Sequence, residues 1–306
     1  MAVAPVNRNS PGRWQALCGF LFIMPWLVGF LIFSLGPMAA SLYLSFCKYD
    51  LHSLEWVGAE NYRRLLTTDP LFWRSLQNTA IYVVCSVPLG LVGSLAIALL
   101  LNQSVRGQRL FRTFFYLPSL VPAVASSLLW LWVLNSENGL LNYGLTLFGV
   151  PHRSCPRWLE DPVWTIPAFV LMSLWGIGGA RMIIFLAGLQ GISESYYEAA
   201  HIDGASTWQK LLFITLPMLT PTIFFNLILG IIGSFQVFTS AYVMTSGGPG
   251  NASLFYVLYL FRNAFEYFKL GKASAMAWIL FGLLLCLTVV QFRYSRRWVH
   301  YEAEHD

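Results

Sequence analysis

Charged side chains are scarce in this sequence. Only 11% of its 306 residues are Asp, Glu, Lys or Arg, whereas soluble domains average about a quarter. Hydrophobic residues make up 57%, and several apolar runs reach the roughly 20 residues that span a bilayer. The composition therefore excludes an ordinary soluble domain and indicates a bundle of membrane helices.

Motifs for catalysis, metal binding and nucleic-acid binding are also missing. No G-x-x-x-x-G-K-[ST] sequence occurs, so we expect no ATP bound through a P-loop. All five histidines lie outside the apolar runs, which leaves a membrane-embedded Ser–His hydrolase without a general base. The net charge of +5 is dispersed, with no basic run interleaved with exposed aromatics. We expect no enzyme activity, no bound cofactor or metal, and no nucleic-acid partner.

The five cysteines form no C-x-x-C pair, which argues against a zinc or redox motif. Three of them lie inside apolar runs and are interpreted as small packing residues. Cys47 and Cys155 fall in segments that we expect on the same side of the membrane, so a disulfide between them stays open.

The apolar runs predict an all-α membrane protein with six transmembrane helices. Residues 1–13 and 293–306 are polar tails around a membrane domain at 14–292, and an even number of spans places both tails on one side. A signal peptide is the alternative for the first run, but the run is too long and lacks a clear cleavage site. The expected spans are 14–35, 78–101, 113–134 (with a proline-kinked entry), 163–186, 218–238 and 273–291.

A polar stretch at residues 195–217 interrupts the apolar C-terminal half. Ser195 with Glu198 fits a capping box, and Ser206 with Gln209 fits a second one. Gly204 between them can adopt positive φ and end the first helix. The sequence therefore predicts two short helices that meet at a glycine.

The same stretch resembles the EAA loop of permease subunits of ABC importers. In that family the loop, here at 191–217, is cytoplasmic and docks into a cleft of the ATP-hydrolysing subunit. The resemblance therefore implies that both termini are cytoplasmic, in agreement with short Arg clusters at 106–112 and 293–297. It implies coupling to the ATPase through the matched residues Glu198, Ala199, Ala200, Asp203, Gly204 and Ala205, followed by Ile214 and Leu216-Pro217.

Further motifs are similar to the carbohydrate-uptake branch, on the side of the first permease of maltose importers. These motifs lie at 36–46, 57–62, 234–238, 242–252 and 273–276. The resemblance implies a bacterial inner-membrane subunit that imports a sugar or polyol by alternating access. Its implied partners are a second permease, two ATPase subunits that bind ATP and Mg, and an extracytoplasmic solute-binding protein.

In permeases of this type the sugar lies between the helices that flank the EAA loop. Matching by register implies a substrate path lined by Ser173, Gly176, Ile177, Ala180, Gly230, Gly233, Ser234, Gln236 and Val237. Few of these residues carry the polar groups that sugar hydroxyls need. Small residues at such positions also suit close packing of membrane helices, so both interpretations stay open.

Two charged residues have alternative interpretations. Arg181 is a charge inside an expected span, which by default indicates a function in the path or gate. It is also close enough to the cytoplasmic end for its side chain to snorkel to the surface. Glu198 either caps its helix or meets a cation of the ATPase subunit, and the two roles are compatible.

Two other classes of membrane protein compete with this interpretation. A stand-alone secondary transporter or channel for a small polar solute is expected to show internal repeats or paired ionisable groups within the membrane. The sequence offers only Arg181. A membrane enzyme needs a polar catalytic set at membrane depth, and none is visible.

Overall fold

The structure is a computed structural model that describes residues 13–50, 53–103 and 107–299. Most of the two predicted tails, residues 1–12 and 300–306, and Arg106 lie outside the described residues. Within the described part the regular structure is helical apart from one two-stranded antiparallel sheet, which pairs Cys47 with Trp56. The all-α prediction is confirmed, with this small hairpin as an addition.

The N-terminal half contains π-helical (η1) and 3₁₀ (η2) turns between its α-helices. Its elements are α1 Arg13–Phe30, η1 Leu31–Leu35, α2 Gly36–Ser45, β1 Cys47–Tyr49, β2 Leu54–Trp56, α3 Glu60–Thr67, α4 Pro70–Leu101, α5 Gln108–Tyr116, η2 Leu117–Leu120, α6 Ala123–Val133 and α7 Leu140–Leu147. The C-terminal half contains η3 His152–Ser154, α8 Pro162–Leu174, α9 Ala180–Gly191, α10 Glu194–Ile202, α11 Thr207–Lys210, η4 Leu211–Thr215, α12 Leu216–Met218, α13 Thr220–Phe235, α14 Thr239–Met244, α15 Tyr256–Phe261, η5 Arg262–Glu266 and α16 Leu270–Ser295.

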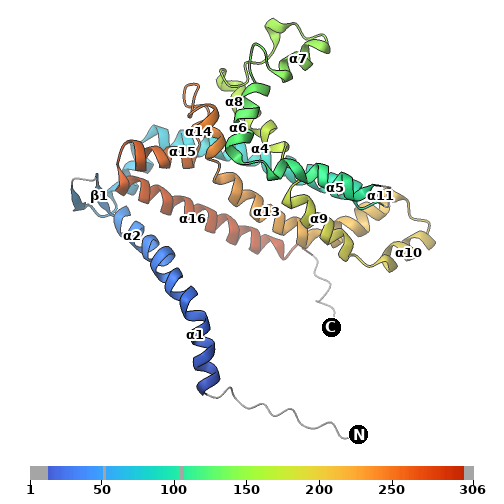
Figure 1. Ribbon diagram of the computed structural model, residues 1–306, viewed down its shortest axis with the longest axis horizontal. Helices are drawn as coiled ribbons and strands as arrows, with labels where there is room; N and C mark the ends of the chain where they lie inside the picture. The colour runs from blue at the N-terminus through green and yellow to red at the C-terminus, as the bar shows by residue number, and fades with distance from the viewer. Residues whose placement is uncertain (1–12, 51–52, 104–106, 300–306) are drawn as a thin grey trace.

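Figure 1 shows α4, α13 and α16 running along the bundle, with β1 at one end and α10 and α11 at the other. Helix α2 packs on α16, while α1 projects away from the bundle and its apolar stretch contains no fully buried residue. The two ends of the bundle are therefore built from different elements.

Four predicted spans are present as helices long and apolar enough to cross a membrane: Leu17–Ser45, Pro70–Leu101, Thr220–Met244 and Leu270–Ser295. A fifth, Gln108–Leu120 with Ala123–Val133, is bent by 95° where Val121-Pro122 interrupts it, as the prolines predicted. The remaining run is divided between two shorter apolar helices, α8 and α9. The count of six is compatible with this arrangement and stays a prediction.

The prediction of one continuous helix at 163–186 is wrong, because the helix breaks between Leu174 and Ala180. Three glycines occupy this break. A Cβ on Gly178 would overlap the carbonyl oxygen of Phe115, and one on Gly179 would lie 2.9 Å from the Cβ of Ser119. Residues of α5 and η2 lie so close to the break that only glycine fits at positions 178 and 179.

The principal core joins α4, α8, α15 and α16 around Phe72, Phe169 and Tyr256, all at most 2% exposed. Asn78 of α4 donates to the carbonyl oxygen of Asn251 at 2.8 Å, and the Tyr256 hydroxyl donates to that of Met276. These bonds attach α15, and the loop before it that contains Gly248-Pro249 and Asn251, to α4 and α16. Cys47 and Cys155 are both free, which answers the question of a disulfide between them.

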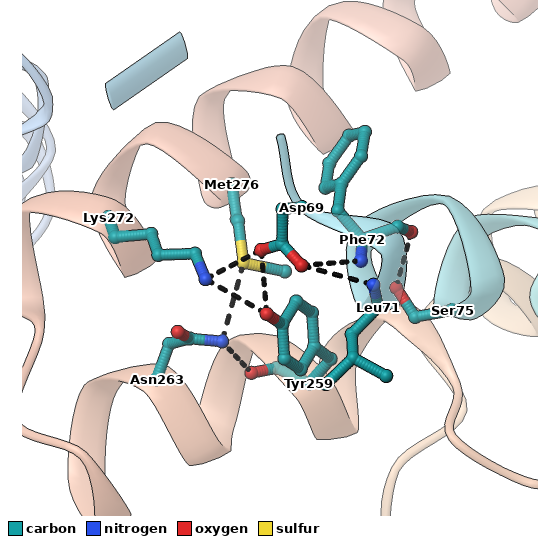
Figure 2. A network of polar contacts seen from close by, with 8 residues as sticks. All are labelled: Asp69, Leu71, Phe72, Ser75, Tyr259, Asn263, Lys272 and Met276. Atoms are coloured by element: carbon teal, nitrogen blue, oxygen red, sulfur yellow. Dashed lines mark hydrogen bonds and ion pairs between the residues drawn. The ribbon is translucent and has the colours of Figure 1, made fainter. Parts of the chain in front are cut away.

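A polar network at the start of α4 joins this helix to α15 and α16 (Figure 2). The Asp69 carboxylate caps α4 by accepting from the backbone N–H groups of Leu71 and Phe72. It also accepts from Lys272 Nζ at 2.6 Å and the Tyr259 hydroxyl at 2.7 Å. Burial opposes ionisation, but these donors and the Lys272 charge outweigh it and lower the pKa of Asp69. Asp69 therefore ties together α4, α15 and α16.

We expect Asp69→Asn to lower the free energy of unfolding by roughly 1–3 kcal/mol, because Lys272 and Tyr259 lose a charged acceptor in a largely buried site. Asparagine keeps the helix cap, so the loss reports on the network. Since the pKa of Asp69 is lowered in the fold, the wild-type advantage exists above its unfolded value of about 4 and disappears as pH falls through its folded value. Thermal unfolding at pH 7 measures the effect. Glu60→Gln, which breaks the exposed pair with Arg64, is the control; equal melting temperatures for both variants would contradict the assignment.

Candidate coupling corner and membrane cavity

The two predicted short helices are present as α10 and α11, at the end of the bundle opposite β1 (Figure 1). Helix α10 begins two residues earlier than expected. Its N-cap is Ser193, whose hydroxyl accepts from the backbone N–H of Ser195 at 3.4 Å. The capping box predicted for Ser195 and Glu198 is therefore wrong. Glu198 lies on the exposed surface of α10.

The glycine bend and the second capping box are confirmed. Gly204 has a φ of +73°, and the N–H of Ala205 bonds the carbonyl of Ala200 at 2.9 Å, which ends α10. Ser206 and Gln209 bond reciprocally, with the Ser206 N–H donating to Gln209 Oε1 at 2.7 Å. These local bonds determine the angle between α10 and α11.

The corner formed by residues 193–210, here called the coupling corner, presents small and apolar side chains to the outside. Neither α10 nor α11 contains a buried residue. Ile202 is 86% exposed and Trp208 is 72% exposed. A Cβ on Gly204 would meet nothing within 4 Å. All six predicted coupling residues lie here, with Glu198, Ala199, Asp203 and Gly204 exposed and Ala200 and Ala205 partly buried.

The coupling corner is attached to the membrane helices through a second core. This core joins α4, α9 and the start of α13, with Phe185, Leu189 and Leu219 at its centre. Tyr197 of α10 packs against it, and its hydroxyl bonds Thr215 Oγ1 at 3.0 Å. Tyr197 thus connects α10 to the core that contains α9.

The other end of α9 borders a cavity of about 300 Å³ at the break after α8. Its lining comes from α4, η2, α8, the break after α8, α9 and α13: Tyr82, Ser86, Gly90, Ser119, Ser173, Gly176, Ile177, Gly179, Ala180, Arg181 and Ser234. A second cavity of about 370 Å³ shares Tyr82, Ser119, Ser173 and Gly176 with it. The second cavity adds aromatic surface from Phe169, Trp175 and Phe238. The two cavities therefore adjoin, and Arg181 lines the first while the aromatic side chains line the second.

The structure brings most of the predicted path residues to these cavities. Ser173, Gly176, Ile177, Ala180, Arg181 and Ser234 line the first, and Val237 lines the second. Gly230 lies beside the Arg181 guanidinium. Gly233 and Gln236 are exposed and line neither. Gln236 directly follows the last residue of α13, Phe235.

Three lining residues of α4 were missed: Tyr82, Ser86 and Gly90. They recur every four residues and continue to Ser94, whose hydroxyl donates to the Ile177 carbonyl in the break at 2.7 Å. This spacing places all four on one helix face. In an apolar run, however, the same pattern is equally typical of close packing. Among the residues that the structure describes, no group of His, Cys, Asp and Glu side chains is arranged to hold a metal ion.

Comparison with known proteins places the chain in a family. The family model described as "Binding-protein-dependent transport system inner membrane component" matches residues 53–300. The chain is 42% identical over 305 residues to the probable ABC transporter permease protein YesP of Bacillus subtilis (strain 168), covering 98% of this chain and 97% of that one. It is 35% identical to the lactose transport system permease protein LacF of Rhizobium radiobacter, over 96% of this chain and 99% of that one.

A third relative is the trehalose/maltose transport system permease protein MalF of Thermococcus litoralis, with 34% identity over 92% of this chain and 95% of that protein. The fold is similar to that of a chain in the crystal structure of a bacterial alginate ABC transporter in complex with alginate pentasaccharide-bound periplasmic protein. That similarity has a TM-score of 0.81 at 23% identity, over 93% of this chain and 96% of that chain. The resemblance seen in the sequence is confirmed: the chain is a multi-pass membrane protein and belongs to the family of inner-membrane permease components of binding-protein-dependent ABC transport systems.

Proposed function

We propose that the chain is one of two permease subunits of an ABC importer for a carbohydrate, a di- or oligosaccharide or a polyol. Two ATPase subunits, which hold ATP and Mg, dock at the coupling corner, and an extracytoplasmic solute-binding protein delivers the substrate at the opposite end. Both termini are then cytoplasmic. The protein catalyses no reaction itself.

The observation that carries this proposal is the exposed coupling corner, which follows α9, the helix whose other end lines a cavity. Ile202 and Trp208 are large, exposed apolar residues on helices that contain no fully buried residue. Exposed apolar patches of this kind mark sites of protein–protein contact. Closure of the ATPase dimer would move α10, and α9 would transmit the movement to Ala180 and Arg181 in the cavity wall. Such movement of packed helices supports alternating access.

The cavities suit a carbohydrate in their chemistry and size. Hydroxyl groups of Tyr82, Ser119 and Ser173 lie in both linings, next to the aromatic surfaces of Trp175 and Phe238. The volumes of about 300 and 370 Å³ fall within the range of small-ligand sites. Relatives named for lactose and for trehalose and maltose support the same substrate class.

Photo-cross-linking in the complete transporter tests the docking. A photoreactive amino acid in place of Trp208 should cross-link to the ATPase subunit, because this side chain is 72% exposed on α11. The matched control is Trp56 of β2, which is 61% exposed at the opposite end of the bundle. The same probe at Trp56 should give no ATPase product. Cross-linking of the ATPase from position 56 but not from 208 would reverse the proposed orientation.

A further inference from the structure

Arg181 carries a charge in the cavity without a counter-charge. Within residues 13–50, 53–103 and 107–299, none of the ion pairs includes Arg181. The described linings of the two cavities contain no carboxylate. Keeping an unpaired cation within a membrane protein is costly, and such residues are by default functional. An anion that pairs with Arg181 would therefore have to come from outside the described chain.

The bundle makes room for this guanidinium. A Cβ on Gly90 of α4 would lie 2.5 Å from Arg181 Nη1, and one on Gly230 of α13 would lie 3.0 Å from Nη2. Glycines on two different helices thus leave space for the two terminal nitrogens of the Arg181 guanidinium. The position of the guanidinium between α4 and α13 argues against an Arg181 side chain that only reaches out to the cytoplasmic surface.

A second group in the same cavity lacks a partner. Ser86 is 4% exposed, and among the described residues its Oγ makes no hydrogen bond of standard distance and angle, although the Tyr82 hydroxyl lies nearby. Of the other three serines in this lining, Ser119 and Ser173 already donate to backbone carbonyls of their own turns. A buried hydroxyl left unpaired costs free energy, which a bound acceptor recovers. The nearby cation favours an acceptor with negative charge.

We propose that the transported saccharide carries an anionic group, and that this group binds at Arg181 and Ser86. A carboxylate, sulfonate or phosphate offers at least two oxygens, which match the planar guanidinium fork in bidentate geometry. The neutral part of the sugar then occupies the adjoining cavity beside Trp175 and Phe238. This inference rests on the proposed function, because it assigns the class of saccharide that the importer carries.

The test is uptake by the complete transporter in proteoliposomes with its binding protein. The probes are a uronic-acid disaccharide, its carboxyl-reduced neutral counterpart, a sugar phosphate and a sulfonated sugar. We expect the wild type to transport at least one anionic probe. Arg181→Gln should reduce that uptake by about tenfold or more, since charge-assisted hydrogen bonds are lost. Arg181→Lys should retain more uptake than Arg181→Gln, and Ser86→Ala should give a smaller loss.

Two controls separate this outcome from a folding defect. Assembly of each variant with its partners is measured first, and Arg297→Gln, a change in the stretch that follows α16, should leave uptake unchanged. The binding protein also selects its ligand, so uptake rates of different probes are not compared directly. The uptake rate of the variant divided by that of the wild type, for one and the same probe, reports on Arg181. The inference is overturned if the wild type carries only neutral saccharides by ATP-driven uptake, if Arg181→Gln transports the anionic probe normally, or if it loses neutral and anionic uptake equally. Absence of ATP-driven uptake for every saccharide would instead overturn the proposed function.

Discussion

Gly204→Leu is expected to abolish ATP hydrolysis stimulated by the loaded binding protein, and transport with it, while the permease still inserts and assembles. Gly204 has a φ of +73°, a conformation that costs a residue with a side chain roughly 1 kcal/mol or more. Leucine would shift α11 relative to α10 and add bulk to a surface of small residues. Coupling free energies between sites are typically a few kcal/mol, so we expect a loss of about tenfold or more in stimulated hydrolysis.

The matched control is Gly149→Leu. Gly149 has a φ of +89°, and a Cβ there also meets nothing within 4 Å, so the backbone strain and the added bulk are comparable. It follows α7, which lies well away from α11 (Figure 1). We expect Gly149→Leu to keep most of the stimulation. Similar activity in the two variants, measured as ATPase rate with and without loaded binding protein, would mean that the coupling corner does not transmit the signal.

Ser234→Trp is expected to block transport by filling the cavity beside Arg181. Ser234 lies on α13 in the lining of the cavity of about 300 Å³, so an indole at this position would occupy the space proposed for substrate. We expect uptake to fall below a tenth of the wild-type rate, with the complex still assembled. Basal ATP hydrolysis should persist, because the coupling corner is untouched.

Leu229→Trp provides the comparison for this substitution. Leu229 is on the same helix, is 47% exposed and lines neither of the two cavities. Its side chain lies about 140° around the helix from Ser234. Uptake by Leu229→Trp should stay close to wild type. A well-assembled Ser234→Trp complex that transports normally would remove the cavity from the substrate path.

The coupling corner could be predicted from the sequence because local bonds determine it. Gly204 and the Ser206–Gln209 box act within a few residues, and both are present as expected. The first N-cap was displaced because Ser193 and Ser195 are both suitable caps, and local pattern does not choose between them. Local chemistry therefore predicted the bend and missed one helix start by two residues.

The membrane cavity was predictable only in part because it depends on contacts between distant segments. The glycines of the α8–α9 break were visible, but the approach of Phe115 that requires Gly178 is a tertiary contact. The face of α4 that carries Tyr82 and Ser86 was equally consistent with packing. Gln236 follows the last residue of α13 and lines neither cavity, so its place in the substrate path stays a prediction. The sequence alone gives no sign that Arg181 lies between Gly90 and Gly230, because the three residues belong to different helices.

Energy source and direction can be measured together in proteoliposomes that contain the complete transporter. We predict that saccharide accumulates only when ATP is on the side of the coupling corner and the binding protein is on the side of the β1–β2 hairpin. Ion gradients alone should drive no uptake. Accumulation driven by an ion gradient without ATP would contradict the account, because it would identify the chain as a secondary transporter.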